Sequence, residues 1–122
     1  MKTIFSIAII FILLSSNACK KNQQSSCDFD MCDSRRNTVL IATNWSGSLG
    51  YYNDFRKWAI NVSIPNSIDG IRTCIICGNI PDSLKKIGRI VTFSGELKEN
   101  CNDVKPIFGG QEIYFVNPTY LK

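Results

Sequence analysis

The pattern of hydrophobic and polar positions after residue 36 predicts five β-strands. Segment 56–64 is the clearest, because Trp58, Ile60 and Val62 alternate with polar or small residues in the period of two that a half-buried strand requires. Four other segments have a β-branched and aromatic composition and are bounded by polar residues, glycine or proline. The five predicted strands are 37–44, 56–64, 71–80, 89–99 and 111–117.

The sequence PDSLKK at 81–86 predicts a short helix between the third and fourth strands. Pro81 suits the first position of a helix, and Asp82 or Ser83 can cap its free N–H groups. Gly88 follows as a residue that commonly ends a helix.

The predicted order is therefore strand, strand, strand, short helix, strand, strand. This order is similar to that of the OB-fold, a small five-stranded Greek-key barrel, so we expect a mainly β protein. Segment 78–99, GNIPDSLKKIGRIVTFSGELKE, also resembles a pattern in small uncharacterised lipoproteins of Gram-negative bacteria. That resemblance implies this fold and an envelope location, and it implies no activity.

A nearly continuous apolar run, 4–14, follows Lys2 at the start of the chain. Such a run is too short to span a bilayer, which takes roughly 20 apolar residues, but it is typical of a secretory signal peptide. Ser16 and Ala18 supply the small residues of an ordinary cleavage site. Removal of residues 1–18 would leave enough chain for one domain and too little for two.

The same region supports a second interpretation, in which Cys19 carries a lipid. Ala18-Cys19 resembles the core of a bacterial lipobox, with Ser16 where leucine is usual, and in that family the cysteine becomes the diacylated first residue. Segment 20–26, KKNQQSS, cannot join a core and would act as a spacer between bilayer and domain. The expected organisation is a signal peptide at 1–18, a lipid-anchored tether with a cysteine-containing segment at 19–36, and a barrel at 37–122.

The number of cysteines bears on this choice. The chain has six, namely Cys19, Cys27, Cys32, Cys74, Cys77 and Cys101. An even number in an exported chain is typical of a disulfide framework, which favours simple secretion with all six paired. Acylation of Cys19 would leave five, and Cys74, in the apolar run IRTCIIC, could then stay unpaired and buried.

For the disulfides we expect Cys77 with Cys101, which would join the ends of the third and fourth strands, and Cys27 with Cys32 as a local link. Cys74 and Cys77 form a C-x-x-C, but a redox site is not expected because residues i and i+3 of a strand point to opposite faces. The alternative use of these thiols is a zinc site. Its ligands would be Cys27, Cys32, Cys74 and Cys77.

Composition excludes several functions. The chain has no histidine, which removes Ser-His and Cys-His catalysis and imidazole metal ligands, and its carboxylates form no convergent pair in the sequence. The formal charge of +4 is spread along the chain, so no nucleic-acid partner is expected. We expect neither an enzyme nor a cofactor or metal.

The remaining candidate is aromatic. Segment 45–55 mixes glycine, serine, asparagine and aspartate with aromatic residues and predicts a loop. Its aromatic residues, with one from the next strand, could form a ligand face for a glycan or a protein, or they could fill one end of the barrel. The candidate ligand face is Trp45, Tyr51, Tyr52 and Trp58. We therefore expect a non-catalytic binding or scaffolding module anchored in the cell envelope; the alternative is a soluble secreted binding or inhibitor protein with six paired cysteines.

Overall fold

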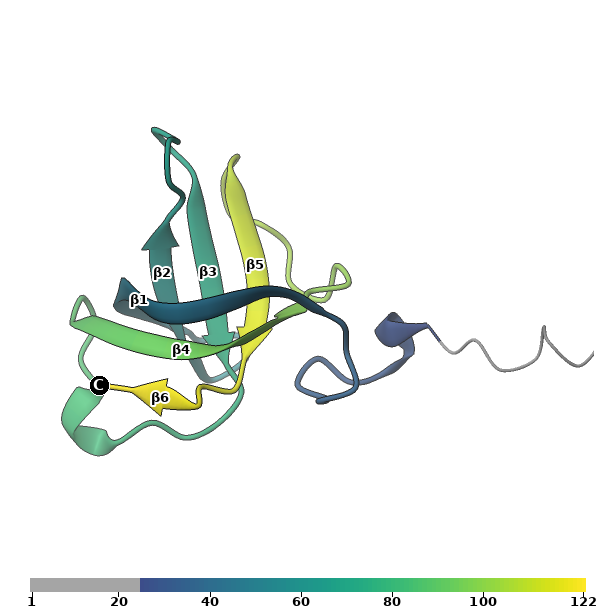
Figure 1. The fold of residues 1–122 in the computed structure, drawn as a ribbon, viewed down its shortest axis with the longest axis horizontal. Coiled ribbons are helices and arrows are strands. Elements are labelled where there is room, and N and C mark those ends of the chain that lie inside the picture. The colour runs from purple at the N-terminus through teal and green to yellow at the C-terminus, as the bar shows by residue number, and fades with distance from the viewer. Residues whose placement is uncertain (1–24) are drawn as a thin grey trace, which may run out of the picture.

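The computed structural model describes residues 25–122 (Figure 1). The predicted signal peptide and the predicted lipid site at Cys19 lie outside these residues. The described chain contains six strands and two short 3-10 turns. They are η1 (Ser26–Asp28), β1 (Thr38–Tyr52), β2 (Lys57–Ser63), β3 (Ile71–Ile76), η2 (Asp82–Leu84), β4 (Ile90–Glu99), β5 (Gln111–Val116) and β6 (Tyr120–Leu121).

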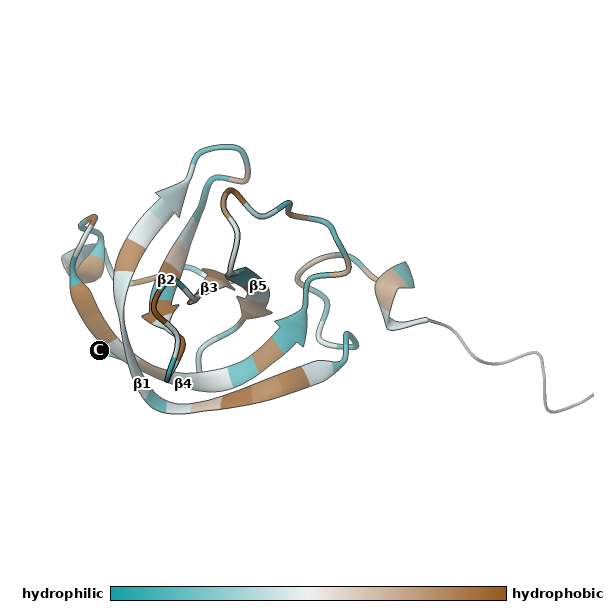
Figure 2. Ribbon diagram, turned by 90° about the horizontal axis from the view of Figure 1, so that it is seen from above, coloured by the Kyte–Doolittle hydropathy of each residue, from teal (hydrophilic) through white to brown (hydrophobic). Residues whose placement is uncertain are grey.

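Five strands close into a barrel, which Figure 2 shows as a ring. The order around the ring is β1-β2-β3-β5-β4, and β4 returns to β1. The β3–β5 pair is parallel and the other pairs are antiparallel. The long β1 makes closure possible because Ser48 is in register with Asn61 of β2 and with Ile90 of β4. The mainly β barrel is confirmed, and β6 is an additional short strand on β4.

The predicted loop at 45–55 is wrong, because β1 continues through it to Tyr52. The strand bends instead of ending: its register with β4 shifts between Ala42 and Trp45, and Asn44 has a φ of 50°. Gly47 is needed where the strands approach closely, since a Cβ atom there would lie 2.6 Å from the carbonyl oxygen of Asn61. The glycine and serine residues that predicted a loop therefore lie in a bent strand.

The predicted short helix at 81–86 is also wrong. Only Asp82–Leu84 is helical, as one 3-10 turn without a side-chain cap, and the described residues contain no longer helix. After Leu84 the chain leaves the helical path and turns toward β1, where the N–H of Gly88 donates to the carbonyl of Leu49 at 2.7 Å. Between residues 25 and 122 there is no helix of the length and apolarity needed to cross a bilayer.

Apolar side chains form two clusters. The larger fills the barrel and includes fully buried Ile60, Phe93 and Leu97. The smaller lies outside the barrel wall, where Ile75 and Phe115 are covered by Val104 of the β4–β5 loop and by neighbouring side chains. Because β3 is covered on both sides, its sequence is apolar at successive positions.

The disulfides join Cys27 to Cys101 and Cys32 to Cys77, so the expected pairs were wrong although all four cysteines are bonded. Strand β5 lies between β3 and β4, with Ile76 at the end of β3 opposite Val116 and Glu99 at the end of β4 opposite Tyr114. Because β4 runs antiparallel to β5, the chain beyond Glu99 leads away from the end of β3. Cys77 and Cys101, which follow those two ends, therefore cannot meet. Segment 25–36 lies beside one end of the barrel in Figure 1 and supplies a disulfide partner to each of these two cysteines.

Candidate binding groove

An open groove lies on the outside of the barrel, between the β1–β2 turn and the β4–β5 loop. Its volume is about 550 Å³. The groove is lined by Ser48, Gly50, Tyr51, Tyr52, Asn53, Asp54, Asn61, Ile71, Ile107, Phe108 and Gln111.

A hydrogen-bonded chain of polar side chains supports the groove. The amide of Gln111 donates to the hydroxyl of Tyr52 at 3.0 Å and to that of Thr73 at 2.8 Å. Thr73 is fully buried and donates in turn to the side-chain oxygen of Asn61, at 2.8 Å. The side-chain oxygen of Gln111 accepts from the backbone N–H of Ile107, at 2.8 Å. These bonds fix the orientation of the polar groups before any ligand binds.

The rim of the groove is apolar and exposed. Ile107 is 75 % exposed, Phe108 42 % and Tyr51 39 %. A second hollow of about 530 Å³, beside the β2–β3 turn, shares Ile71 and Phe108 with the groove. Exposed apolar side chains gathered around a hollow are typical of a binding surface.

The predicted ligand face is divided by the fold. Tyr51 and Tyr52 line the groove. Trp45 instead packs edge-on against Phe93 of the barrel interior, at a centroid distance of 6.3 Å, and belongs with the larger cluster. Trp58 packs against the same cluster but also touches Tyr51 edge-on, at 5.3 Å. Trp58 therefore lies behind the groove rim.

Sequence reasoning missed Ile107, Phe108 and Gln111, which lie more than 50 residues from the tyrosines. One signal was present: Ile107-Phe108 is an apolar pair between the polar stretch NCNDVK and the turn GG. An apolar pair in a loop without an obvious core position is a candidate for a contact surface.

The groove carries little charge. Asp54 is the one ionisable acid among its lining residues, and none of them is lysine or arginine. The groove therefore has hydrogen-bonding amides, hydroxyls and aromatic rings without a charged pair, which suits an uncharged polar ligand.

The four-cysteine zinc alternative is contradicted, because three of its cysteines are in disulfides and Cys74 is buried. Within residues 25–122, one set of potential metal donors lies close together, namely Cys27, Cys101 and Glu99. Its two sulfurs are bonded to each other and are not available as thiolate ligands.

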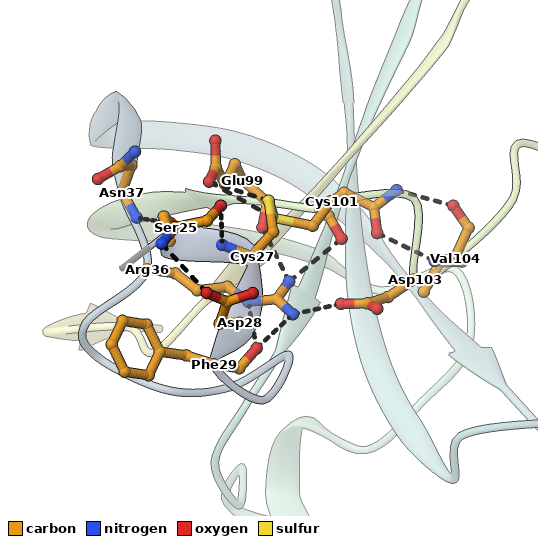
Figure 3. Close-up of a disulfide and its surroundings, with 12 residues drawn as sticks. Ser25, Cys27, Asp28, Phe29, Arg36, Asn37, Glu99, Cys101, Asp103 and Val104 are labelled. Carbon is orange, nitrogen blue, oxygen red and sulfur yellow. Dashed lines mark hydrogen bonds and ion pairs between the residues drawn. A yellow bond between two sulfur atoms is a disulfide. The ribbon is translucent and has the colours of Figure 1, made fainter. Parts of the chain in front are cut away.

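The base of the β4–β5 loop is fixed by the N-terminal segment, as Figure 3 shows. Arg36 is only 3 % exposed. Its guanidinium donates to the carbonyls of Phe29, Glu99 and Asn100 at 2.8–3.2 Å and forms an ion pair with Asp103. Together with the Cys27–Cys101 disulfide, these bonds hold the loop that carries one wall of the groove.

Comparison of the sequence with protein-family models and with curated proteins finds no match.

Proposed function

We propose that this chain is an envelope lipoprotein, anchored through lipid on Cys19, whose barrel is a non-catalytic binding module for a glycan. The observation that carries the anchor is the pairing of the cysteines. Within residues 25–122, two disulfides use four of the five cysteines, and Cys74 has no disulfide partner among them and is fully buried. A disulfide from Cys19 to Cys74 would require opening the barrel core, so the soluble alternative with six paired cysteines is disfavoured.

The strand order supports the finer assignment of the barrel to the OB-like Greek-key class. A ring of β1-β2-β3-β5-β4 with β3 parallel to β5 has the connectivity expected of that class. OB-folds bind oligosaccharides and oligonucleotides at the β2–β3 face and at the β1–β2 and β4–β5 loops. The groove occupies this position, with Asn61 from β2, Ile71 from β3, Asn53 from the first loop and Phe108 from the second.

The groove chemistry favours the glycan over the other ligands of such barrels. Aromatic side chains such as Tyr51 and Phe108 can pack on the apolar faces of sugar rings, while amides such as Asn61 can bind hydroxyl groups. An oligonucleotide would need cations along its backbone, and the groove lining has none.

The anchor is tested by growing cells with an alkyne-bearing palmitate and detecting the label on the protein. We expect labelling of the natural chain, loss of the label in Cys19→Ser, and retention in Cys74→Ala. Equal labelling of Cys19→Ser would refute the anchor.

Glycan binding is tested by titrating the Trp45→Phe variant with neutral hexasaccharides, namely maltohexaose and chitohexaose. In this variant the fluorescence comes from Trp58, which touches Tyr51 of the rim. We expect a saturable change with one of these sugars or with another neutral glycan of an array. No response to any glycan would remove this ligand class.

A further inference from the structure

Residues 85–90, KKIGRI, comprise the turn before β4 and the first residue of that strand, and we call this segment the basic turn. All six residues are exposed, and Ile87 and Ile90 are 71 % and 70 % exposed. The turn joins η2 to β4; neither element lines the groove, although Ile90 is in register with the groove residue Ser48 of β1. Two isoleucines this exposed, three residues apart and among cations, call for a separate explanation.

The basic turn is held firmly, so the isoleucines are not exposed through loose structure. The N–H of Gly88 donates to the carbonyl of Leu49 at 2.7 Å, and the carbonyl of Arg89 accepts from the N–H of Leu49 at 2.9 Å. Gly88 has a φ of 84°, which glycine adopts without strain. Leu84 is buried directly before the turn. The backbone thus presents Ile87 and Ile90 to solvent in a fixed arrangement.

Cations surround the two isoleucines. Lys85, Lys86 and Arg89 belong to the turn, and Lys122 lies nearby because its backbone exchanges hydrogen bonds with Thr92 of β4. Asp82, which pairs with Lys85, is the single acid between residues 82 and 92. The surface combines aliphatic side chains with a net positive charge.

We propose that the basic turn docks onto an anionic lipid bilayer, with Ile87 and Ile90 entering the interface and the cations lying among the headgroups. Aliphatic insertion and attraction of lysine and arginine to anionic lipids are the two terms that bind proteins to membrane surfaces. Nucleic acid is a poorer fit because the turn has no aromatic residue for stacking. The contact would act beside the lipid on Cys19, and in that respect it rests on the proposed anchor.

In Figures 1 and 2, η2 lies at one end of the long axis and the N-terminal segment lies at the other end. The basic turn follows η2 directly, so the bilayer contact that we propose lies at the opposite end of the barrel from segment 25–36.

The test uses a chain of residues 20–122, which lacks Cys19 and retains the whole barrel and both disulfides. Its binding is measured by co-sedimentation with vesicles of phosphatidylcholine containing 30 % phosphatidylglycerol, and with vesicles of phosphatidylcholine alone. We expect binding to the anionic vesicles that weakens with salt. The double variant Ile87→Ser with Ile90→Ser should lower the partition coefficient at least about tenfold.

Matched control variants distinguish binding through the basic turn from non-specific binding through exposed apolar side chains elsewhere on the protein. The pair Ile41→Ser with Ile68→Ser removes two isoleucines that are 67 % and 99 % exposed, and it should leave vesicle binding unchanged. Each lysine or arginine near an anionic membrane contributes about 1 kcal/mol to binding, so Lys86→Glu should weaken vesicle binding roughly fivefold or more. Lys105→Glu, outside the basic turn, should have a smaller effect. Circular dichroism of each variant checks that the barrel is intact.

The proposal is overturned if the chain does not bind anionic vesicles, if it binds neutral vesicles equally well, or if the two isoleucine pairs have equal effects. None of these results would bear on palmitate labelling of Cys19 or on glycan titration. Conversely, an unlabelled Cys19 with vesicle binding through Ile87 and Ile90 would leave the docking surface standing and refute the anchor.

Discussion

The two halves of the β4–β5 loop differ in how they are held. At the base, Cys101 is bonded to Cys27, and the side chain of Asn100 exchanges two hydrogen bonds with the backbone of Val104. At the tip, residues 105–110 are all exposed, and Ile107 is held through its N–H to Gln111. Stability thus concentrates in the base and the candidate binding surface in the tip, so changes to the two halves should have separable consequences.

Removal of the base disulfide should give the largest change in stability. The Cys27–Cys101 bond spans 74 residues, and its loss in Cys27→Ala with Cys101→Ala should lower the free energy of unfolding by about 4 kcal/mol, mainly through the unfolded chain. Urea denaturation measures this value. A variant with Cys27→Ala and Cys32→Ala should lose both disulfides; if one disulfide remained, the pairing described above would be wrong.

Arg36 should have the next largest effect. Arg36→Met leaves the carbonyls of Phe29 and Asn100 and the carboxylate of Asp103 without their buried partner, so we expect a loss of about 3 kcal/mol by urea denaturation. The neighbouring Arg35 is the matched control, because its side chain is 66 % exposed. Equal effects of Arg35→Met and Arg36→Met would contradict the role assigned to the base.

The tip should show the reverse pattern. Phe108→Ser removes an exposed ring from the groove rim, so unfolding should change by less than about 0.5 kcal/mol while glycan affinity falls roughly tenfold. Calorimetric titration and urea denaturation of the same preparation measure both quantities. A stability loss like that of Arg36→Met would mean that the tip is structural.

Tyr52→Phe should have the smallest effect on glycan affinity, and it should lower the stability of the protein as well. It removes the acceptor of one hydrogen bond from Gln111, whose amide still donates to Thr73. We expect about 1 kcal/mol less stability and a few-fold weaker glycan binding. Unchanged binding would show that the fixed orientation of Gln111 does not matter to the ligand.

Features that depend on local sequence were predictable, whereas features that depend on contacts between distant segments were not. All five barrel strands follow local hydrophobic patterns, and for β2, β3, β4 and β5 the predicted segments overlap the observed strands closely. The local pattern does not predict that β1 continues past Trp45. Gly47 favours a loop by its local preference, but it is required there because β2 approaches β1 closely at this point. The disulfides and the pairing of Ile107 and Phe108 with the two tyrosines depend on which strand ends meet, and no local pattern carries that information.

Cys74 provides the central test. If Cys19 carries a lipid, five cysteines remain, four of them form the two disulfides, and Cys74 is the one left unpaired. Burial raises the pKa of the Cys74 thiol to about 12, so at pH 8 it should stay protonated and unreactive while the protein is folded. Above that pKa, or on unfolding, the thiolate can form.

The decisive measurement is the intact mass of the protein purified from its own cells and treated with iodoacetamide at pH 8, folded and in denaturant, without a reducing agent. We expect acyl mass on a chain that begins at Cys19, no alkylated cysteine in the folded protein, and one alkylated cysteine in the unfolded protein. An unacylated chain with no alkylated cysteine in denaturant would show six paired cysteines and contradict this expectation.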